Sequence, residues 1–329
     1  MPEVRYRGRR AVQIENDHLR VTVLVEGGHV AEIFHKKTGV NPLWTPPWPS
    51  IEPSSYDRGL HPEYGADSES KLLAGIAGHN LCLDTFGAPS AEEADAGVTV
   101  HGESSVVPYW IEERGDTLVM RARLPLAQLM FERHIRLHGQ EVLFNEEVEN
   151  LSAHDRPIAW TQHVTLGPPF IERGVTQFRA PIVKSMTLEG DEFQWPGTAG
   201  ESMLTYTEKP VAGGFSTHLI QIDRRQAFFL AYSPSSRLLF GYSWQREDFP
   251  WLGIWDETCS RTGPPWNGET ITRGMEFGAS PFPESRRKMI DRGSLFGVPA
   301  FRWLPARGKI RVEYMAFAME RPGIFDDLP

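Results

Sequence analysis

The sequence has few cysteines, no long apolar run and fewer basic than acidic side chains. Its two cysteines, Cys82 and Cys259, lie in no Cys-x-x-Cys or Cys/His pattern, so neither a disulfide framework nor a structural zinc site is predicted. No run of about 18 apolar residues occurs, which argues against a membrane-spanning helix. Asp and Glu total 43 against 34 Lys and Arg, so we expect neither nucleic acid nor an anionic membrane surface as the main partner.

Several motifs that bind cofactors or mark hydrolases are also missing. There is no Gly-x-Gly-x-x-Gly after a strand, no phosphate-binding Gly-x4-Gly-Lys-Ser/Thr, no Gly-x-Ser-x-Gly and no His-Glu-x-x-His. No short-range spacing joins His79, His101, His163 and Glu276 into a metal site, so we expect neither a metal nor another cofactor. The basic N-terminus is not followed by the apolar segment of a secretory signal, and a cytoplasmic location is therefore expected.

Period-two alternation of apolar residues is the main pattern of the sequence. It predicts two hairpins, with glycine turns at 27–28 and 138–139, and several further strands. The predicted strands are 19–25, 30–34, 117–124, 131–137, 142–150, 217–222, 227–232, 238–244 and 309–319. Helical signals are short, at 69–77, 90–94 and 283–291, so an alternating βαβ organisation is not expected. We predict an all-β protein of large packed antiparallel sheets, with residues 1–329 in a single domain.

Three residues near the ends of strand-like segments are candidates for proton transfer. His101 is followed by a glycine, which allows a ligand or another strand to approach the backbone closely. His163 precedes a Gly-Pro-Pro segment that ends its strand, so we expect it near the mouth of a sheet. Glu276 has glycine and apolar neighbours, and partly dry surroundings would raise its pKa. Any one of these residues is more often structural, but a glutamate base facing histidine acids commonly moves protons on a hydroxylated substrate.

Tryptophans gather in the segment 244–256, close in sequence to a candidate base. Aromatic rings stack on the C–H faces of sugars while acids and amides bind the hydroxyls, so the segment favours a carbohydrate ligand. Trp251 and Trp255 are four residues apart and share one face of a strand. Asp256 lies on the opposite face from Trp255, so all three can contact one ligand only if the strand is bulged.

Taken in order, several segments resemble the aldose 1-epimerase (galactose mutarotase-like) superfamily. The residues 15–34, followed by Thr38-Gly39 and Trp44, look like the first hairpin of that family. His101-Gly102 is similar to its first active-site His-Gly, and His163 occupies the place of its second histidine. Gly274-Met-Glu276-Phe looks like the segment that bears the catalytic base, and 302–319 matches the closing strand pair. The resemblance covers nearly the whole chain.

The resemblance implies a β-supersandwich and an anomer-interconverting enzyme that acts on a small-molecule sugar without a cofactor. Glu276 would take the proton of the anomeric hydroxyl and His163 would protonate the ring oxygen, so that the ring opens, the C1–C2 bond rotates and the ring closes again. His101 would hydrogen-bond the substrate. His79 and Asn80 fall near the place of a sugar-binding arginine, and Trp251, Trp255 and Asp256 complete the predicted substrate-binding residues.

Two alternatives stay open, the first because the family arginine is missing from its usual context and the second because the fold of the resembling family also occurs in glycan-cleaving enzymes. The first is a non-catalytic sugar-binding or regulatory protein on the same fold, which predicts ligand binding that survives Glu276→Gln. The second is a glycan lyase or hydrolase, which would need a longer open cleft. Fold alone does not decide among these functions, and the sequence does not determine the oligomeric state.

Overall fold

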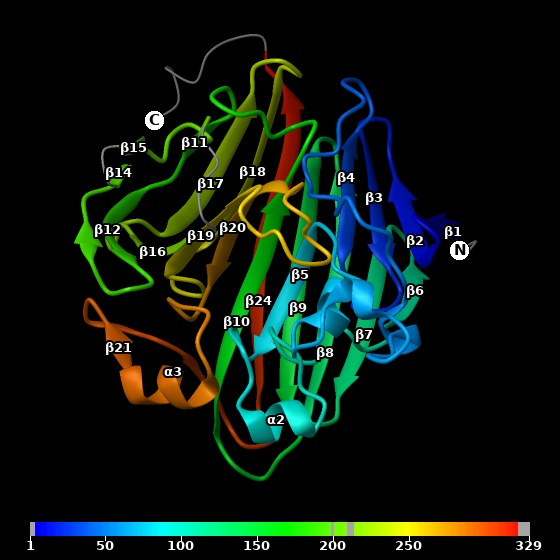
Figure 1. Ribbon diagram of the computed structural model, residues 1–329, viewed down its shortest axis with the longest axis vertical. Coiled ribbons are helices and arrows are strands. Elements are labelled where there is room, and N and C mark those ends of the chain that lie inside the picture. Colours follow the sequence, from blue (N-terminus) through cyan, green and yellow to red (C-terminus); the bar gives the residue numbers. More distant parts are fainter. Residues whose placement is uncertain (1–3, 199–200, 209–213, 322–329) are drawn as a thin grey trace.

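Two large antiparallel sheets form the framework of the protein and share one extensive apolar core (Figure 1). The computed structural model describes residues 4–198, 201–208 and 214–321. These sheets confirm the prediction of an all-β, antiparallel fold. No helix within the described ranges is long and apolar enough to cross a membrane.

Within the described residues, one sheet has twelve strands and the other has eight. The twelve-stranded sheet follows the order β1 (Val4–Tyr6), β2 (Arg9–Glu15), β3 (Leu19–Leu24), β4 (Val30–His35), β5 (His79–Asp84), β10 (Arg156–Leu166), β20 (Ile271–Gly278), β19 (Trp251–Thr258), β16 (Gly214–Ile220), β12 (Ile182–Thr187) and β13 (Glu192–Phe193), with β23 (Arg302–Leu304) paired to β10. The eight-stranded sheet follows the order β11 (Gln177–Arg179), β17 (Gln226–Ser233), β18 (Leu238–Gln245), β24 (Lys309–Glu320), β9 (Glu141–Asn150), β8 (Leu129–His138), β7 (Thr117–Leu124) and β6 (Trp110–Arg114). Two small hairpins are β14 (Gly197–Thr198) with β15 (Glu201–Ser202), and β21 (Ser294–Leu295) with β22 (Val298–Pro299).

Each strand predicted from alternation is present within a few residues of its expected bounds. The largest shift is at β16, which ends at Ile220 because a turn begins after Gln221. Helices are present in the three predicted segments, as α1 (Ser70–Leu73), α2 (Ala91–Asp95) and α3 (Arg286–Arg292). Helix α1 covers only four residues of the predicted 69–77, and α3 begins three residues later than predicted. Two 3₁₀ turns are η1 (Pro53–Ser55) and η2 (Pro62–Tyr64). Helices α2 and α3 lie together at one end of the molecule, where an ion pair of 2.9 Å joins Arg286 to Glu93 (Figure 1).

Strand β10 has one face in the core and one face directed away from it. Trp160 and Gln162 donate hydrogen bonds of 3.1 and 2.7 Å to Glu146 of the eight-stranded sheet, so this face points between the sheets. Because side chains alternate along a strand, His163 and Thr165 point to the outer face. Three long segments supply the cover for this outer face. Segments 36–78 and 259–270 connect strands of the twelve-stranded sheet, and segment 85–109 leads from β5 of this sheet to β6 of the other.

A charged pair lies at the centre of the core between the two sheets. Arg133 on β8 and Glu146 on β9 are 2.7 Å apart, and their side chains are 1% and 0% exposed. Tyr314 donates a further hydrogen bond of 2.6 Å to Glu146. A buried charge is tolerated when its partner and its hydrogen bonds are all in place, so each member of this network depends on the others.

Removing Arg133 should therefore destabilise the protein strongly. We expect Arg133→Met to lower the free energy of unfolding by about 3 to 5 kcal/mol, because Glu146 would remain buried without its partner. Urea titration measures this change. The matched control is Arg287→Met, whose side chain is 85% exposed, and it should change stability by less than about 1 kcal/mol. Equal effects of the two substitutions would contradict the assigned role of Arg133.

Candidate active site

His163 and Glu276 are directly opposite one another on neighbouring strands. Strand β10 pairs with β20 in the register that aligns His163 with Glu276. His163 Nε2 lies 3.2 Å from Glu276 Oε1, and His163 Nδ1 lies 3.0 Å from the hydroxyl of Thr165. Both side chains are buried on the outer face of the sheet. The pairing brings together two residues that are more than one hundred positions apart in the sequence.

Burial determines the protonation of this pair. It raises the pKa of Glu276 to about 8. Burial, followed by the nearby ring of His101, lowers the pKa of His163 well below its usual range. Desolvation disfavours the charged form of each group, so near neutral pH the pair retains a single proton between the two side chains. A pair that holds one proton contains one acid and one base, which is the minimum equipment for proton transfer in both directions.

His101 joins the pair from a loop rather than from a strand. The expectation that it ends a strand is wrong, because it lies in a turn at φ 69° between α2 and β6. Its Nδ1 donates a hydrogen bond of 2.5 Å to the carbonyl of Phe86, which leaves Nε2 as an acceptor. Its ring centroid is 4.7 Å from that of His163. Burial lowers the pKa of His101 to about 4, so the ring is neutral near pH 7.

The glycine after His101 has a packing role. A Cβ on Gly102 would overlap with the carbonyl oxygen of Leu83, and its φ of 81° lies in the left-handed region. Only glycine therefore allows the loop to approach β5 this closely. The observation supports the expected close approach at this position, made here by a neighbouring strand.

A cavity of about 290 Å³ opens over the pair. His101, His163 and Glu276 line it together with the aromatic side chains of Trp44, Trp255, Trp266 and Phe215. The rings of Trp44 and Trp266 are stacked with centroids 6.0 Å apart, and Trp255 meets Trp266 edge to face at 5.9 Å. Flat apolar walls beside an acid–base pair suit a ligand that has both C–H faces and hydroxyl groups.

An ion pair also lines the cavity. Arg261 lies 3.6 Å from Glu69, and its guanidinium lies over the rings of Trp266 and Trp255 at 4.6 and 5.4 Å. Burial raises the pKa of Glu69, and the nearby Arg261 opposes this effect. The pair offers one hydrogen-bond donor group and one acceptor group to a ligand in the cavity. Neither residue was predicted to line the site. Glu69 begins the predicted helical segment 69–77 and is the N-cap of α1, but nothing in that pattern shows that its side chain faces a cavity, and Arg261 lies in a loop without periodicity.

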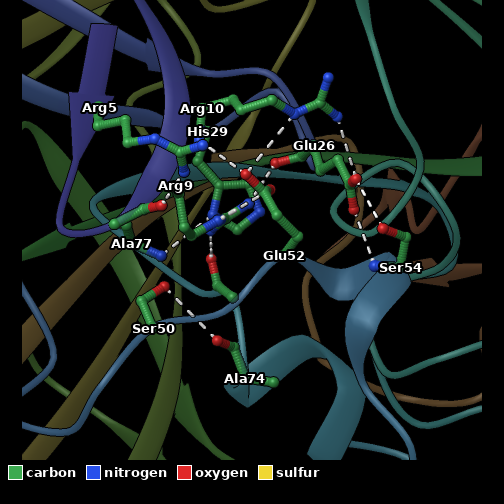
Figure 2. Close-up of polar contacts among 12 residues, drawn as sticks. Arg5, Arg9, Arg10, Glu26, His29, Ser50, Glu52, Ser54, Ala74 and Ala77 are labelled. Atoms are coloured by element: carbon green, nitrogen blue, oxygen red, sulfur yellow. Dashed lines mark hydrogen bonds and ion pairs between the residues drawn. The ribbon is translucent and has the colours of Figure 1, made fainter.

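Ile76 lines the cavity, and hydrogen bonds from Arg9 and His29 hold the segment that carries it. Both residues belong to a polar cluster near the N-terminal strands (Figure 2). The buried Arg9 of β2 donates a hydrogen bond to the carbonyl of Gly75. The ring of His29 accepts a hydrogen bond of 3.0 Å from the backbone N–H of Ala77. These two contacts lie on either side of Ile76 in the chain, so a segment without regular secondary structure is held in one place.

Two residues that were predicted to bind substrate are buried away from the cavity. His79 is fully buried between the sheets, where its ring nitrogens lie 3.0 Å from the hydroxyl of Tyr242 and 2.9 Å from Oε1 of Gln162. Trp251 shares the outer face with Trp255, as expected, but its ring is fully buried and donates a hydrogen bond of 3.1 Å to the carbonyl of Pro299. Neither side chain lines the cavity.

Asp256 and Asn80 also do not line the cavity, for different reasons. Asp256 faces the other side of the sheet and accepts two hydrogen bonds of 2.7 and 2.8 Å from Arg273. Asn80 is opposite His163 in the register of β5 with β10, and its amide donates to Ser105 at 3.1 Å. The buried Oδ1 of Asn80 has no hydrogen-bond partner among the described residues. Of the predicted binding residues, His101 and Trp255 line the cavity.

Comparison with solved structures identifies the fold. A candidate aldose 1-epimerase from Klebsiella pneumoniae superposes with a TM-score of 0.69 at 14% identity, over 96% of this chain and 80% of that one. A galactose mutarotase-like protein from Clostridium acetobutylicum gives 0.67 at 15% identity, over 97% and 98%. One from Lactobacillus casei gives 0.63 at 12% identity, over 94% and 100%.

Comparisons by sequence are negative. No protein-family model matches the chain, and no curated protein sequence matches it either. The structural matches cover almost all of the chain, but their sequence identities are low, so they show only that the fold is shared. They agree with the resemblance drawn from the sequence motifs at the level of the fold. The protein therefore has the fold of the aldose 1-epimerases and galactose mutarotase-like proteins.

Proposed function

We propose that the protein is an aldose 1-epimerase-like enzyme that interconverts the anomers of a sugar. The observation that carries the proposal is the contact of 3.2 Å between Glu276 and His163 in an aromatic-lined cavity. The reaction needs a base at the anomeric hydroxyl and an acid at the ring oxygen, and then the same two groups in exchanged roles. A pair that shares one proton supplies both.

The proposed step is balanced within the pair. Burial favours the neutral pair, with the proton on Glu276, and the step begins when this proton passes to His163 across the contact of 3.2 Å. The Glu276 carboxylate then accepts the proton of the anomeric hydroxyl while the His163 imidazolium gives its proton to the ring oxygen. The C1–O bond of the ring breaks and C1 becomes an aldehyde. After rotation about C1–C2, His163 takes back the proton of the hydroxyl and Glu276 returns its proton to the carbonyl oxygen as the ring closes.

The other residues of the cavity have binding roles in this proposal. His101 offers Nε2 as an acceptor for a substrate hydroxyl, since its Nδ1 is committed to Phe86. Trp255 contributes an apolar surface for one face of the sugar, and the pair of Glu69 and Arg261 contributes polar partners for hydroxyl groups. Because the side chains of His163 and Glu276 are both buried, bulk water has limited access to them.

The test is NMR exchange spectroscopy of anomer interconversion, with a panel of free and phosphorylated sugars. The wild-type protein should accelerate the exchange of at least one sugar above the rate in buffer, and His163→Ala should lose about 10²- to 10⁴-fold of this acceleration. If no sugar exchanges faster than in buffer but one binds, and its binding survives Glu276→Gln, the protein is a sugar-binding protein without this activity. A fully active His163→Ala would show that the acid is a different residue.

A further inference from the structure

The position of the Glu276 carboxylate depends on a glycine two residues earlier on the same strand. Side chains at 274 and 276 share one face of β20. A Cβ on Gly274 would overlap with Oε1 of Glu276 and would lie 3.2 Å from Cδ and 3.4 Å from Cγ. The Glu276 side chain therefore folds back along its own strand and occupies the space that any side chain at 274 would need.

His163 of β10 and the ring of Phe215 of β16 lie on the two sides of Glu276 across the sheet. On β10, His163 Nε2 contacts Oε1 of Glu276 at 3.2 Å. On β19, Gly253 is opposite Glu276, and the ring of Phe215 covers it so closely that a Cβ on Gly253 would lie 2.6 Å from the ring. The Glu276 carboxylate thus contacts His163 on one side and extends over Gly274, and the Phe215 ring covers the position opposite Glu276 on β19. We name Gly274, His163 and Phe215 the carboxylate seat.

The backbone does not itself require glycine at 274. Gly274 is paired regularly with Thr165 on β10 and with Trp255 on β19. Its φ is outside the left-handed region, so an alanine could adopt the same backbone conformation. The three atoms nearest to the added Cβ all belong to the side chain of Glu276. The conflict that a side chain at 274 would create is therefore with the carboxylate and its stem.

We propose that Gly274 is a positioning residue, whose missing side chain holds the Glu276 carboxylate against His163 in the geometry needed for proton transfer. The inference rests on the proposed function, because it assigns a role in that reaction. A carboxylate is the flexible end of its side chain, so it moves more easily than the strands. A methyl group at 274 therefore displaces Oε1 from His163 rather than breaking the sheet.

The experiment compares Gly274→Ala with the wild-type protein. We expect kcat to fall about 10²-fold, as for a reacting group misplaced by about 1 Å, while KM changes less than about threefold. A crystal structure of the variant should show Oε1 of Glu276 beyond hydrogen-bonding distance of His163 Nε2. Titration of the Glu276 carboxyl by ¹³C NMR should give a lower pKa than in the wild type, because the displaced group gains access to solvent.

A matched control makes the same chemical change where no atom is displaced. A Cβ on Gly263 would meet nothing within 4 Å, and its φ is also outside the left-handed region. Gly263→Ala should therefore retain wild-type kcat, KM and Glu276 titration. If Gly274→Ala also retains the contact of Glu276 with His163 and the wild-type titration, the proposal is wrong.

Two further comparisons separate the sources of failure. If Gly274→Ala does not fold, the same substitution is made in a Glu276→Ala background, where the conflicting atoms are gone. If folding is restored in that background, the conflict between residue 274 and the Glu276 side chain is supported. If the double variant also misfolds, the proposal is wrong. If the wild-type protein interconverts no sugar, the proposed function fails, but the crystal structure and the carboxyl titration still test whether Gly274 positions Glu276.

Discussion

Glu276→Gln should lower the rate of sugar anomer interconversion by about 10²- to 10⁴-fold, the contribution typical of one proton-transfer group. Glutamine has nearly the same size as glutamate, so it fills the same space over Gly274, but its amide cannot accept the proton of the anomeric hydroxyl. NMR exchange at saturating sugar measures the change in kcat. Binding should persist, because the aromatic walls and the pair of Glu69 and Arg261 are retained.

The control for this substitution is Glu313→Gln on the exposed face of β24, which makes the same chemical change far from the cavity lining. It should retain the wild-type rate. An active Glu276→Gln would exclude Glu276 as the proton acceptor, whatever the activity of the control.

The pH dependence of the wild-type rate gives an independent reading of the same pair. The active form holds one proton between Glu276 and His163, and the pKa of Glu276 is about 8. The rate should therefore stay level from about pH 6 to 7 and fall as the pH rises through about 8, where the pair loses its only proton. Any residual activity of Glu276→Gln should lack this transition. A rate that instead increases through pH 8 would mean that the fully deprotonated pair is the active form.

Acidification from pH 7 to pH 5 should destabilise the folded protein by several kcal/mol. Burial is the largest cause that lowers the pKa of six histidines, of which His35 is one. In the other five it lowers the pKa to about 3 for His29 and His218, to about 4 for His101, and well below the usual value for His79 and His163. The unfolded chain binds protons at these rings near pH 6.5, but the folded chain does not. The stability that these groups contribute is present above the unfolded pKa and is lost as the pH falls.

The expected size of this effect follows from the linkage of proton binding to unfolding. His29, His101 and His218 should each cost about 2 kcal/mol between pH 7 and pH 5, and His79 and His163 act in the same direction. Glu276 opposes them, because its pKa is raised, so its contribution is full below the unfolded pKa of about 4.5 and is lost as the pH rises through about 8. It offsets about 2 to 3 kcal/mol over the same range. The net loss is a large part of the roughly 5 to 15 kcal/mol that stabilise a typical domain.

Urea unfolding at pH 7 and pH 5 measures this loss, and calorimetry at pH 6 should detect proton uptake on unfolding. His138, whose side chain is 79% exposed, provides the control, and His138→Gln should leave the difference between the two pH values unchanged. Equal stability of the wild-type protein at pH 7 and pH 5 would mean that the buried rings are protonated in the folded state.

Much of the site could be anticipated from local patterns and motif resemblance. Alternation predicted that His163 and Thr165 share a face and that Trp255 and Asp256 do not, and both statements hold. The glycine and apolar neighbours of Glu276 indicated a dry carboxyl, in agreement with its raised pKa. These patterns could not predict that His79 lies in the core. Period two places His79 and Asn80 on opposite faces of the strand, but it does not say which face packs against the other sheet.

The sequence by itself determined the all-β architecture, the bounds of most strands and the sets of residues that share a face, because these features depend on spacing within one segment. Only the tertiary structure decided which of these residues from different segments contact one another. The contact of His163 with Glu276 requires the register between β10 and β20, and the pair of Glu69 and Arg261 requires two loops to converge over the sheet. Such contacts join segments distant in the sequence, and they are chosen by the packing of the whole chain rather than by any local period.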